Sequence, residues 1–469
     1  MFDLLLRGAH VVDPLNGINQ VADVAIAEDK IAALGASLDV PAHETVDFTG
    51  YVLQPGIIDS HVHLGSMWGS PFGPRMLAMN GVTTCLDMAG PLDDILDNVP
   101  EYGVGINMAI LQFASPPFTF KTNTPSKAEM VELIDRSLDN GALGVKLLGG
   151  HYPLTPEVSA TLIETALERR AYIAWHAGTS AHGSNIEGMQ EAVEMANGYP
   201  LHLAHINAYC RGAIKDEIEE AQLAIDLLKK NPNIFSESYI SPMNGTRLTC
   251  DENGQIQSKV TGNCLRRFGY TPDREGVKAA ILAGKAFVVY DAGGYSDLMT
   301  GQKAYEYWEA NNTNVGGSFN VNPPIPRILI AQAKRDDGSF VVDAISTDGG
   351  CIPRNVILSL GLSLVKLGVL TLPEFVQKTS LNPARMLRLQ QKGHLSMGAD
   401  ADITIYDLAT QTPKATLVGG QKVLWDGQIL SKGATVICTE RSVKSIEARG
   451  LKAIAVDPSQ PVERIHIGE

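Results

Sequence analysis

The stretch Gln54-Pro55-Gly56-Ile57-Ile58-Asp59-Ser60-His61-Val62-His63 predicts a short buried strand that ends in two histidines separated by one residue. Because side chains alternate between the two faces of a strand, His61 and His63 point to the same side. Two neutral imidazoles that converge on one point suit a divalent ion such as zinc. Alone, the motif is weak, and two unrelated polar residues at a strand end are the simpler interpretation. Metal binding therefore requires further ligands elsewhere in the chain.

The length and charge of the chain limit what it can be. With 469 residues it is too long for one ordinary hydrophobic core, so we expect two domains, one of which can be a large α/β barrel. The net charge of −14 leaves no basic surplus to neutralise phosphate groups. We therefore expect a small-molecule substrate as the partner, and neither nucleic acid nor a membrane.

Cysteine usage and the N-terminal sequence favour the cytoplasm. The six cysteines are scattered without a C-x-x-C pair, which is typical of reduced thiols, although Cys250 and Cys264 remain a conceivable pair. The N-terminus carries Asp3 where a secretory signal carries basic residues. The most apolar run, 356–370, is too short to span a bilayer and contains Lys366, so we expect a packed helix there.

The two ends of the chain share a sequence pattern typical of short β-strands, which the middle lacks. Alternating apolar segments and turn signals fill residues 1–53, and the same pattern returns after residue 386, where Trp425-Asp426-Gly427 predicts a tight turn. We therefore predict one small β-sandwich domain built from both termini, with its N-terminal part at 1–53 and its C-terminal part and tail at 386–469.

The middle, residues 54–385, alternates short apolar strands with amphipathic helices, which is the pattern of a parallel α/β sheet. Helices are predicted at 126–140 and 157–169. Eight strands are predicted, at 52–58, 83–88, 106–111, 142–148, 172–176, 201–205, 234–238 and 341–345. The fold class is therefore α/β, a (β/α)8 TIM-like barrel. An insertion at about 244–340, with a helix at 274–283 and a strand at 286–290, is long enough to form a lid or subdomain over the barrel mouth.

Chemistry in a parallel barrel lies at the C-terminal ends of the strands. The polar residues predicted at these ends are His61, His63, Lys146, His176, His205 and Asp348. Each has an ordinary alternative: a histidine can be a core or rim residue, Asp348 can belong to a turn, and Lys146 can extend its ammonium group to solvent. The joint occurrence of all six at strand ends favours a functional site.

Several motifs, together with the order of these residues, resemble the amidohydrolase superfamily. The segment 55–63 is similar to the first-strand signature of that superfamily. Further similarities are Gly81-Val82-Thr83-Thr84, Asn382-Pro383-Ala384-Arg385 and Gly398-Ala399-Asp400-Ala401-Asp402. Within the superfamily, the order His-x-His, Lys, His, His, Asp resembles the binuclear branch with a carboxylated lysine. This branch includes dihydroorotases, hydantoinases and isoaspartyl dipeptidases.

The resemblance implies a metal site with two divalent ions, for which zinc is our expectation, with manganese and iron left open. It implies that His61, His63 and Asp348 bind the more buried ion, that His176 and His205 bind the other, and that carboxylated Lys146 bridges them. A buried lysine favours its neutral amine, which can capture CO2. The implied reaction is attack of a metal-bridging hydroxide on a carbonyl, with Asp348 as the catalytic proton acceptor and donor.

Substrate recognition is less well defined by the sequence. The long insertion resembles that of D-aminoacylases and other N-acyl-D-amino-acid deacylases, but those enzymes bridge their metals through a cysteine, and Cys85 is not at the corresponding position. We therefore interpret Cys85 as a core residue, and His151 and His182 as loop residues. Substrate-binding candidates near strand ends are Tyr152, Asn207, Arg211, Tyr239 and Arg247. An arginine there can pair with a substrate carboxylate, although rim salt bridges explain these residues equally well.

The predicted function is metal-dependent hydrolysis of an amide-type C–N bond, in an N-acyl amino acid or in a cyclic amide or ureide. Three alternatives remain open. The first is a mononuclear deaminase of the same superfamily, which generally lacks the bridging lysine. The second is a formyl-releasing subunit of a complex, and the third is a hydrolase-like subunit without catalysis. The sequence leaves the stereochemistry of the substrate open, and a homo-oligomer is possible.

Overall fold

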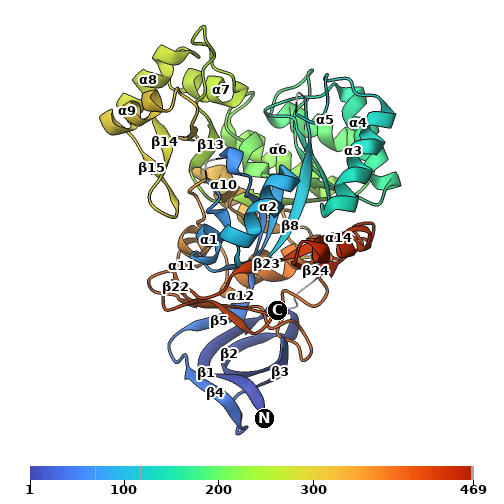
Figure 1. The fold of residues 1–469 in the computed structure, drawn as a ribbon, viewed down its shortest axis with the longest axis vertical. Coiled ribbons are helices and arrows are strands. Elements are labelled where there is room, and N and C mark those ends of the chain that lie inside the picture. Colours follow the sequence, from blue (N-terminus) through green and yellow to red (C-terminus); the bar gives the residue numbers. More distant parts are fainter. Residues whose placement is uncertain (69, 117, 466–469) are drawn as a thin grey trace.

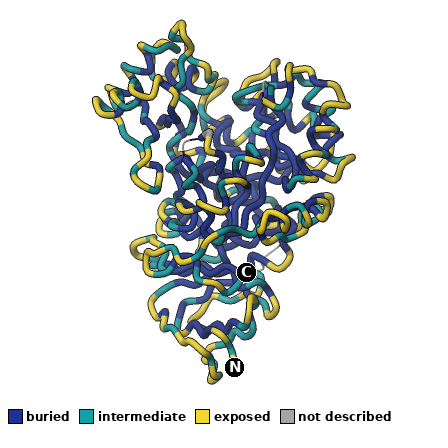
Figure 2. The backbone as a smooth tube through the Cα atoms, viewed as in Figure 1, coloured by how far each residue is buried: buried dark blue, intermediate teal, exposed yellow. Residues whose placement is uncertain are grey.

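The computed structural model describes residues 1–68, 70–116 and 118–465. Figure 1 shows three parts: a barrel in the middle, a sheet that contains the N-terminus below it, and a yellow-green lobe at the upper left. The most deeply buried backbone runs through the barrel (Figure 2). Within the described residues, no helix has both the length and the apolar character that crossing a membrane requires.

The central sheet is the predicted parallel barrel. Each strand pairs in parallel with the next, and the eighth is interrupted, so that β17 pairs with β12 and β18 pairs with β6. The strands are β6 (Ile57–His63), β7 (Val82–Ala89), β8 (Val104–Ala114), β9 (Gly144–Leu148), β10 (Tyr172–His176), β11 (Leu201–Leu203), β12 (Ile234–Tyr239), β17 (Ala344–Ser346) and β18 (Gly349–Gly350). The TIM-like fold class is thus confirmed.

Helices follow the strands and cover the outside of the barrel. The larger ones are α2 (Leu92–Tyr102), α3 (Lys127–Asn140), α4 (Pro156–Glu168), α5 (Ile186–Ala196), α6 (Glu217–Lys230) and α10 (Pro324–Gln332). Shorter ones are α1 (Gly73–Ala78), α11 (Leu362–Lys366), α12 (Leu372–Val376), α13 (Asn382–Met386) and α14 (Val443–Ala448). Helix α3 begins at a capping box of Ser126 and Glu129 and ends at Gly141, whose φ of 117° favours glycine. Both helices predicted in this region are confirmed.

The first predicted strand, 52–58, is wrong as one element. Residues Val52–Pro55 form β5 in the terminal sheet, and β6 begins at Ile57 in the barrel. The chain changes sheets at Gly56, where a Cβ atom would lie 2.2 Å from Thr83 Oγ1. The apolar pattern did not reveal this change because both strands are buried on both faces.

The terminal sheet combines both ends of the chain, as predicted. It has nine strands in the order β22-β21-β20-β19-β5-β1-β2-β3, with β4 beside β1. They are β1 (Phe2–Asp13), β2 (Ile18–Ala27), β3 (Lys30–Gly35), β4 (Ala42–Asp47), β19 (Ile403–Asp407), β20 (Thr412–Val418), β21 (Gln421–Trp425) and β22 (Gln428–Ile429), besides β5. The antiparallel pair β5–β19 joins the two halves. Asp426 and Gly427 both have positive φ, as the predicted tight turn requires.

The last part of the chain does not stay in the terminal sheet. Strand β23 (Gly433–Cys438) pairs in parallel with β8, and β24 (Lys452–Ala455) pairs with β23, so both extend the barrel sheet. The sequence assigned all of 386–469 to the sandwich and tail, because short alternating strands look alike in either sheet. The exact domain boundaries stay a prediction.

The insertion is a subdomain with its own core. Its sheet has the order β13-β16-β14-β15, and Trp308 and Phe319 are buried beneath it. Its elements are β13 (Met243–Arg247), α7 (Lys259–Arg267), α8 (Arg274–Leu282), β14 (Ala286–Asp291), β15 (Ser296–Met299), α9 (Gln302–Ala310) and β16 (Gly316–Asn320). Helix α10 then packs on α6 of the barrel, and the predicted bounds of the insertion, about 244–340, stay a prediction.

Candidate metal centre

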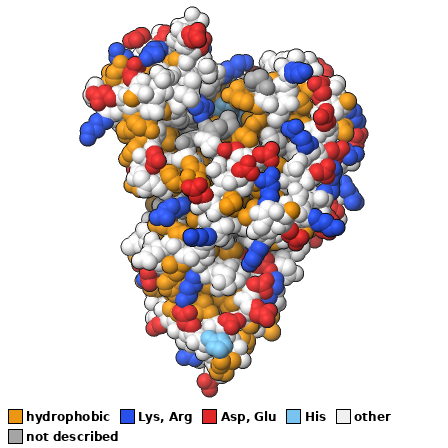
Figure 3. Space-filling view, viewed as in Figure 1, with side chains coloured by type: hydrophobic (Ala, Val, Ile, Leu, Met, Phe, Trp, Pro, Cys, Tyr) orange, Lys and Arg blue, Asp and Glu red, His pale blue; other side chains and the backbone are white. Residues whose placement is uncertain are grey.

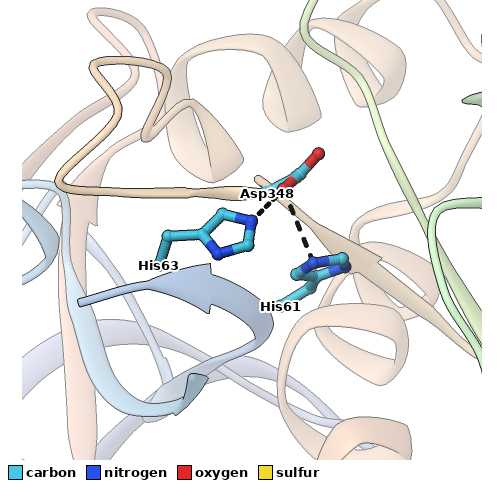
Figure 4. Close-up of side chains that lie close together, drawn as sticks. All are labelled: His61, His63 and Asp348. Carbon is cyan, nitrogen blue, oxygen red and sulfur yellow. Dashed lines mark hydrogen bonds and ion pairs between the residues drawn. The ribbon is translucent and has the colours of Figure 1, made fainter. Parts of the chain in front are cut away.

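Three predicted ligands converge at one end of the barrel. His61 and His63 lie at the end of β6, and Asp348 lies in the break between β17 and β18 (Figure 4). Asp348 Oδ1 is 2.8 Å from His63 Nε2 and 3.5 Å from His61 Nε2, and one ligand atom of each residue lies within 4.8 Å of the others. Two imidazole nitrogens and a carboxylate oxygen are a donor set that suits zinc, manganese or iron.

Burial sets the charges of these three residues. It lowers the pKa of the His61 imidazole well below its ordinary value and also lowers that of His63, so both rings offer neutral nitrogens. Burial alone would raise the pKa of Asp348, but the Arg354 guanidinium and the two histidines together hold it well below its ordinary value. The cluster therefore presents an anionic oxygen and two neutral nitrogens, which fits a cation.

Lys146 lies beside this cluster, inside the barrel. Its Nζ is 2.9 Å from His61 Nε2 and 3.2 Å from the carbonyl oxygen of Met88. Burial lowers the pKa of this amine to about 8, so the neutral form that reacts with CO2 is accessible near neutral pH.

His176 and His205 form a second pair next to the first cluster. His176 Nδ1 and His205 Nε2 face each other at 3.0 Å, and the His205 ring stacks on His61 with centroids 5.2 Å apart. Burial lowers the pKa of His205 to about 3 and that of His176 well below its ordinary value, so these rings are also neutral. Gly150 approaches so closely that a Cβ there would lie 2.0 Å from His176 Nε2.

Glu237 is a site residue that sequence reasoning missed. It is fully buried in β12, and its Oε1 lies 2.6 Å from His61 Nδ1 and accepts a hydrogen bond from the His205 amide at 2.6 Å. Its Oε2 accepts a hydrogen bond from Ser346. Burial raises the pKa of this carboxyl to about 8. A glutamate inside a buried strand was the available signal, because such a charge needs partners.

Arg354 was also missed, and it holds Asp348 directly. Its Nη2 lies 2.7 Å from the Asp348 carboxylate, its Nε donates to the Asp348 carbonyl at 2.5 Å, and its Nη1 donates to Met243 at 2.9 Å. Asp348 itself has a φ of 53°, a conformation that only a few residue types adopt without strain. Nothing in the loop sequence around residue 354 distinguishes this arginine from a surface one.

A cavity of about 600 Å³ opens from the metal cluster to the surface between the barrel and the insertion. Figure 3 shows the surface indented between the two upper lobes. His63, Lys146, His176, His205 and Asp348 line its inner end. Trp68 and His151 also line it, with the Trp68 ring centroid 4.6 Å from that of His63. His151 was predicted to be a loop residue, and it lies in a loop that reaches this cavity.

The predicted substrate residues are distributed unevenly around this cavity. Arg211 lines it, and Tyr239, which is buried, accepts a hydrogen bond from Arg211 at 2.9 Å. Asn207 is buried below and accepts hydrogen bonds from Ser238 and from the Tyr239 amide. Tyr152 packs on Phe118, and Arg247 donates to Asn314 within the insertion. Of the five, only Arg211 belongs to the cavity wall among the described residues, and their roles in binding stay predictions.

The remaining candidates lie outside the site. His182 pairs with Glu191 at 3.0 Å on the surface. Cys85 is a buried core residue, and all six cysteines, including Cys250 and Cys264, are free thiols.

Comparisons with known proteins show which families the chain is similar to. The model of the Amidohydrolase family matches residues 366–430. A dihydroorotase of Geobacter metallireducens is 25% identical over 88% of this chain and 91% of its own length. In sequence the chain is similar to members of the amidohydrolase superfamily.

Solved structures agree on the fold. A D-aminoacylase variant crystallised with CuCl2 superposes with a TM-score of 0.66 at 17% identity, covering 93% of this chain and all of that one. The N-acyl-D-glutamate deacylase of Bordetella bronchiseptica, complexed with zinc and a phosphonate inhibitor, superposes with a TM-score of 0.65 at 16% identity. The match covers 92% of this chain and 98% of that one. At this identity the likeness concerns the fold alone.

Proposed function

We propose that this amidohydrolase uses two divalent ions to cleave an amide-type C–N bond, either in an N-acyl amino acid or in a cyclic amide or ureide. The observation that carries the proposal is the convergence of His61, His63, Asp348 and Lys146 at the inner end of a cavity large enough for a small substrate.

In this proposal His61, His63 and Asp348 would hold one ion, and His176 and His205 would hold the other. Lys146, as its carbamate, would supply a further anionic donor to these ions, and the 2.9 Å between its Nζ and His61 Nε2 supports this role. Bound ions would supply Lewis acidity toward a carbonyl oxygen and lower the pKa of water toward neutrality. Zinc remains our expected metal because imidazole and carboxylate donors suit it.

The side chains of this chain have separable roles. Asp348 accepts a proton from the attacking water and returns it to the departing nitrogen, as a positioned carboxylate can. Glu237 fixes the orientation of the His61 ring, since its Oε1, 2.6 Å from Nδ1, leaves Nε2 facing the metal cluster. Arg354 keeps Asp348 oriented. Trp68 and His151 cover the cluster and limit the access of bulk water.

The relatives support both linear and cyclic substrates. Dihydroorotases are the sequence relatives, whereas deacylases of N-acyl-D-amino acids are among the structural ones. The insertion subdomain forms one wall of the cavity, so the shape of this wall decides which substrates reach the cluster.

A metal analysis followed by an activity screen tests the proposal. Protein purified without chelators should contain up to two equivalents of metal. After loading with zinc or manganese, it should hydrolyse at least one member of a panel of N-acetyl- and N-formyl-L- and D-amino acids and cyclic ureides. Failure to retain metal, or ammonia release from aminated heterocycles alone, would contradict the proposal, and the latter result would favour the deaminase.

A further inference from the structure

The cavity wall is cationic although the chain as a whole is acidic. The net charge is −14, yet the wall contains six basic side chains and one carboxylate, that of Asp348. The basic residues are Lys146, Arg211, Lys259, Arg266, Arg267 and Arg354. Lys146 belongs to the metal cluster, and Arg354 is paired with Asp348. Four cations therefore remain on the wall without a role in the metal site.

Arg211 is held rigidly by neutral partners. Its Nε donates to Asn322 at 2.7 Å, and its Nη2 donates to Tyr239 and Asn244 at 2.9 and 3.0 Å. The side chain is half-buried, and among the described residues no carboxylate lies within 4.0 Å of its nitrogens. Because a partly buried charge normally has a counter-ion, the opposite charge is expected to come from a ligand.

The other three cations stand on α7 of the insertion. Thr261, Cys264 and Leu265 face the core of the subdomain. Arg266 donates to Asn263 and Arg267 donates to the Arg211 carbonyl, so both of these hydrogen-bond partners are neutral. In the part of the chain that the structure describes, none of the three forms an ion pair. Helix α7 therefore presents an outer group of cations that continues the inner one at Arg211.

We propose that the substrate carries two anionic groups, one facing Arg211 close to the scissile bond and the other facing Lys259 and Arg266 on α7. This inference rests on the proposed amide hydrolysis and adds the substrate class. An N-acyl amino acid with an acidic side chain has this arrangement, since its α-carboxylate lies beside the amide and its second carboxylate lies several bonds away. Cations that line a cleft in an acidic protein also raise the rate at which anions enter it.

Paired probes that differ by one charge test the inference. Binding of N-acetylglutamate and N-acetylglutamine, both enantiomers of each, is measured by calorimetry on the full-length protein without metal, and kcat/KM is measured on the metal-loaded enzyme. We expect the glutamate derivative to bind at least about tenfold more tightly, with a preference that falls as salt increases. The double variant Lys259→Gln/Arg266→Gln should reduce this ratio to near one without weakening the binding of the glutamine derivative.

Lys278→Gln is the matched control. It removes a cation from the same subdomain, where Lys278 lies over the Tyr305 ring, and it should keep the wild-type ratio. A wild-type ratio near one, or a ratio that survives the double variant, would overturn the inference. A charge-dependent binding ratio without hydrolysis of any probe would support the inference while contradicting the proposed function, so the two failures are distinguishable.

Discussion

The His61 side chain shows how a single residue is prepared for metal binding. Glu237 contacts Nδ1 at 2.6 Å, and Nε2 faces both Lys146 and Asp348. An acceptor on one ring nitrogen fixes the tautomer, so the lone pair of the other nitrogen is directed into the site. The ring is therefore oriented before any ion binds.

Lys146→Ala should lose most of the bound metal and the activity, because the neutral amine that forms the carbamate is removed. Metal content by atomic absorption and turnover of the best substrate measure the effect. Small carboxylic acids should restore part of the activity by occupying the vacated position. Lys127→Ala, which changes an exposed lysine paired with Glu168, is the control. Wild-type turnover in Lys146→Ala would show that the lysine does not bridge.

Arg354→Ala should lower kcat about 10²-fold with a smaller change in KM, because Asp348 loses the contacts that orient its carboxylate. Arg354→Lys should recover part of the loss. Arg169→Ala, which breaks a surface pair with Asp135, should behave as the wild type. An unchanged kcat in a folded Arg354→Ala protein would remove this positioning role.

At this scale the sequence was informative only where a residue type is unusual for its place. Histidines and a lysine at strand ends were recognisable, and the structure brings all of them together with Asp348. Glu237 was recognisable as a charged residue inside a predicted buried strand. Arg354 was not recognisable, because its partners, Asp348 and the Met243 carbonyl, are brought close to it only by the fold.

At the scale of elements, a buried lysine occupies the short helical segment Gln377–Leu381 that joins α12 to α13. Lys378 Nζ donates to the Val342 carbonyl at 2.6 Å and lies 4.1 Å from the centroid of the Phe340 ring. Burial lowers the pKa of this amine from 10.5 to about 7. The Lys378 amine, which contacts the chain just before the eighth barrel strand, therefore has a lower pKa in the folded protein than in the unfolded chain.

Lys378 should make the protein more stable as the pH rises from about 7 toward 10. In that range the unfolded chain binds more protons at this position than the folded one, so the free energy of unfolding increases with pH by at most about 1.4 kcal/mol per unit. Lys378→Met should flatten this part of the profile, measured as Tm from pH 7 to 9. Parallel profiles for the two proteins would contradict the assignment.

Strands and helices were predictable where burial against one sheet or along one helix face fixes the order of apolar and polar residues. The barrel strands and α3 follow from apolar runs and caps, and most predicted bounds differ from the observed ones by only a few residues. The change of sheet at Gly56 and the return of β23 to the barrel were not predictable, because strand partners are chosen by tertiary packing. The sheet of the insertion was not predicted for the same reason, and β14 was its one predicted strand.

At the scale of the whole molecule, the C-terminal segment binds the underside of the barrel. Arg464 Nε lies 2.6 Å from Asp343, just before the eighth strand, and its Nη2 donates at 2.7 Å to Ile234, which begins β12. The carboxylate is buried and the guanidinium is mostly covered. This contact ties the end of the chain to the last two strands of the barrel.

Arg464→Ala should destabilise the protein by about 3 kcal/mol, because it leaves the buried Asp343 carboxylate without its cation. Calorimetric unfolding measures the change. The control, Arg449→Ala, breaks exposed pairs with Asp93 and Asp97 and should cost less than about 1 kcal/mol. Equal effects of the two variants would show that the C-terminal contact is not structurally important.

The return of β23 to the barrel also constrains how the chain is made. Strand β9 covers only Leu111–Ala114 of β8, and β23 covers the preceding part from Val104 to Ala109 on that strand. Until β23 has been synthesised, this stretch of β8 is an open strand edge of the kind that recruits other chains. The pairing is also distant in sequence, which slows folding. A nascent chain, or one truncated before Gly433, is therefore aggregation-prone until β23 has been synthesised, and chaperone demand is expected to last until that point.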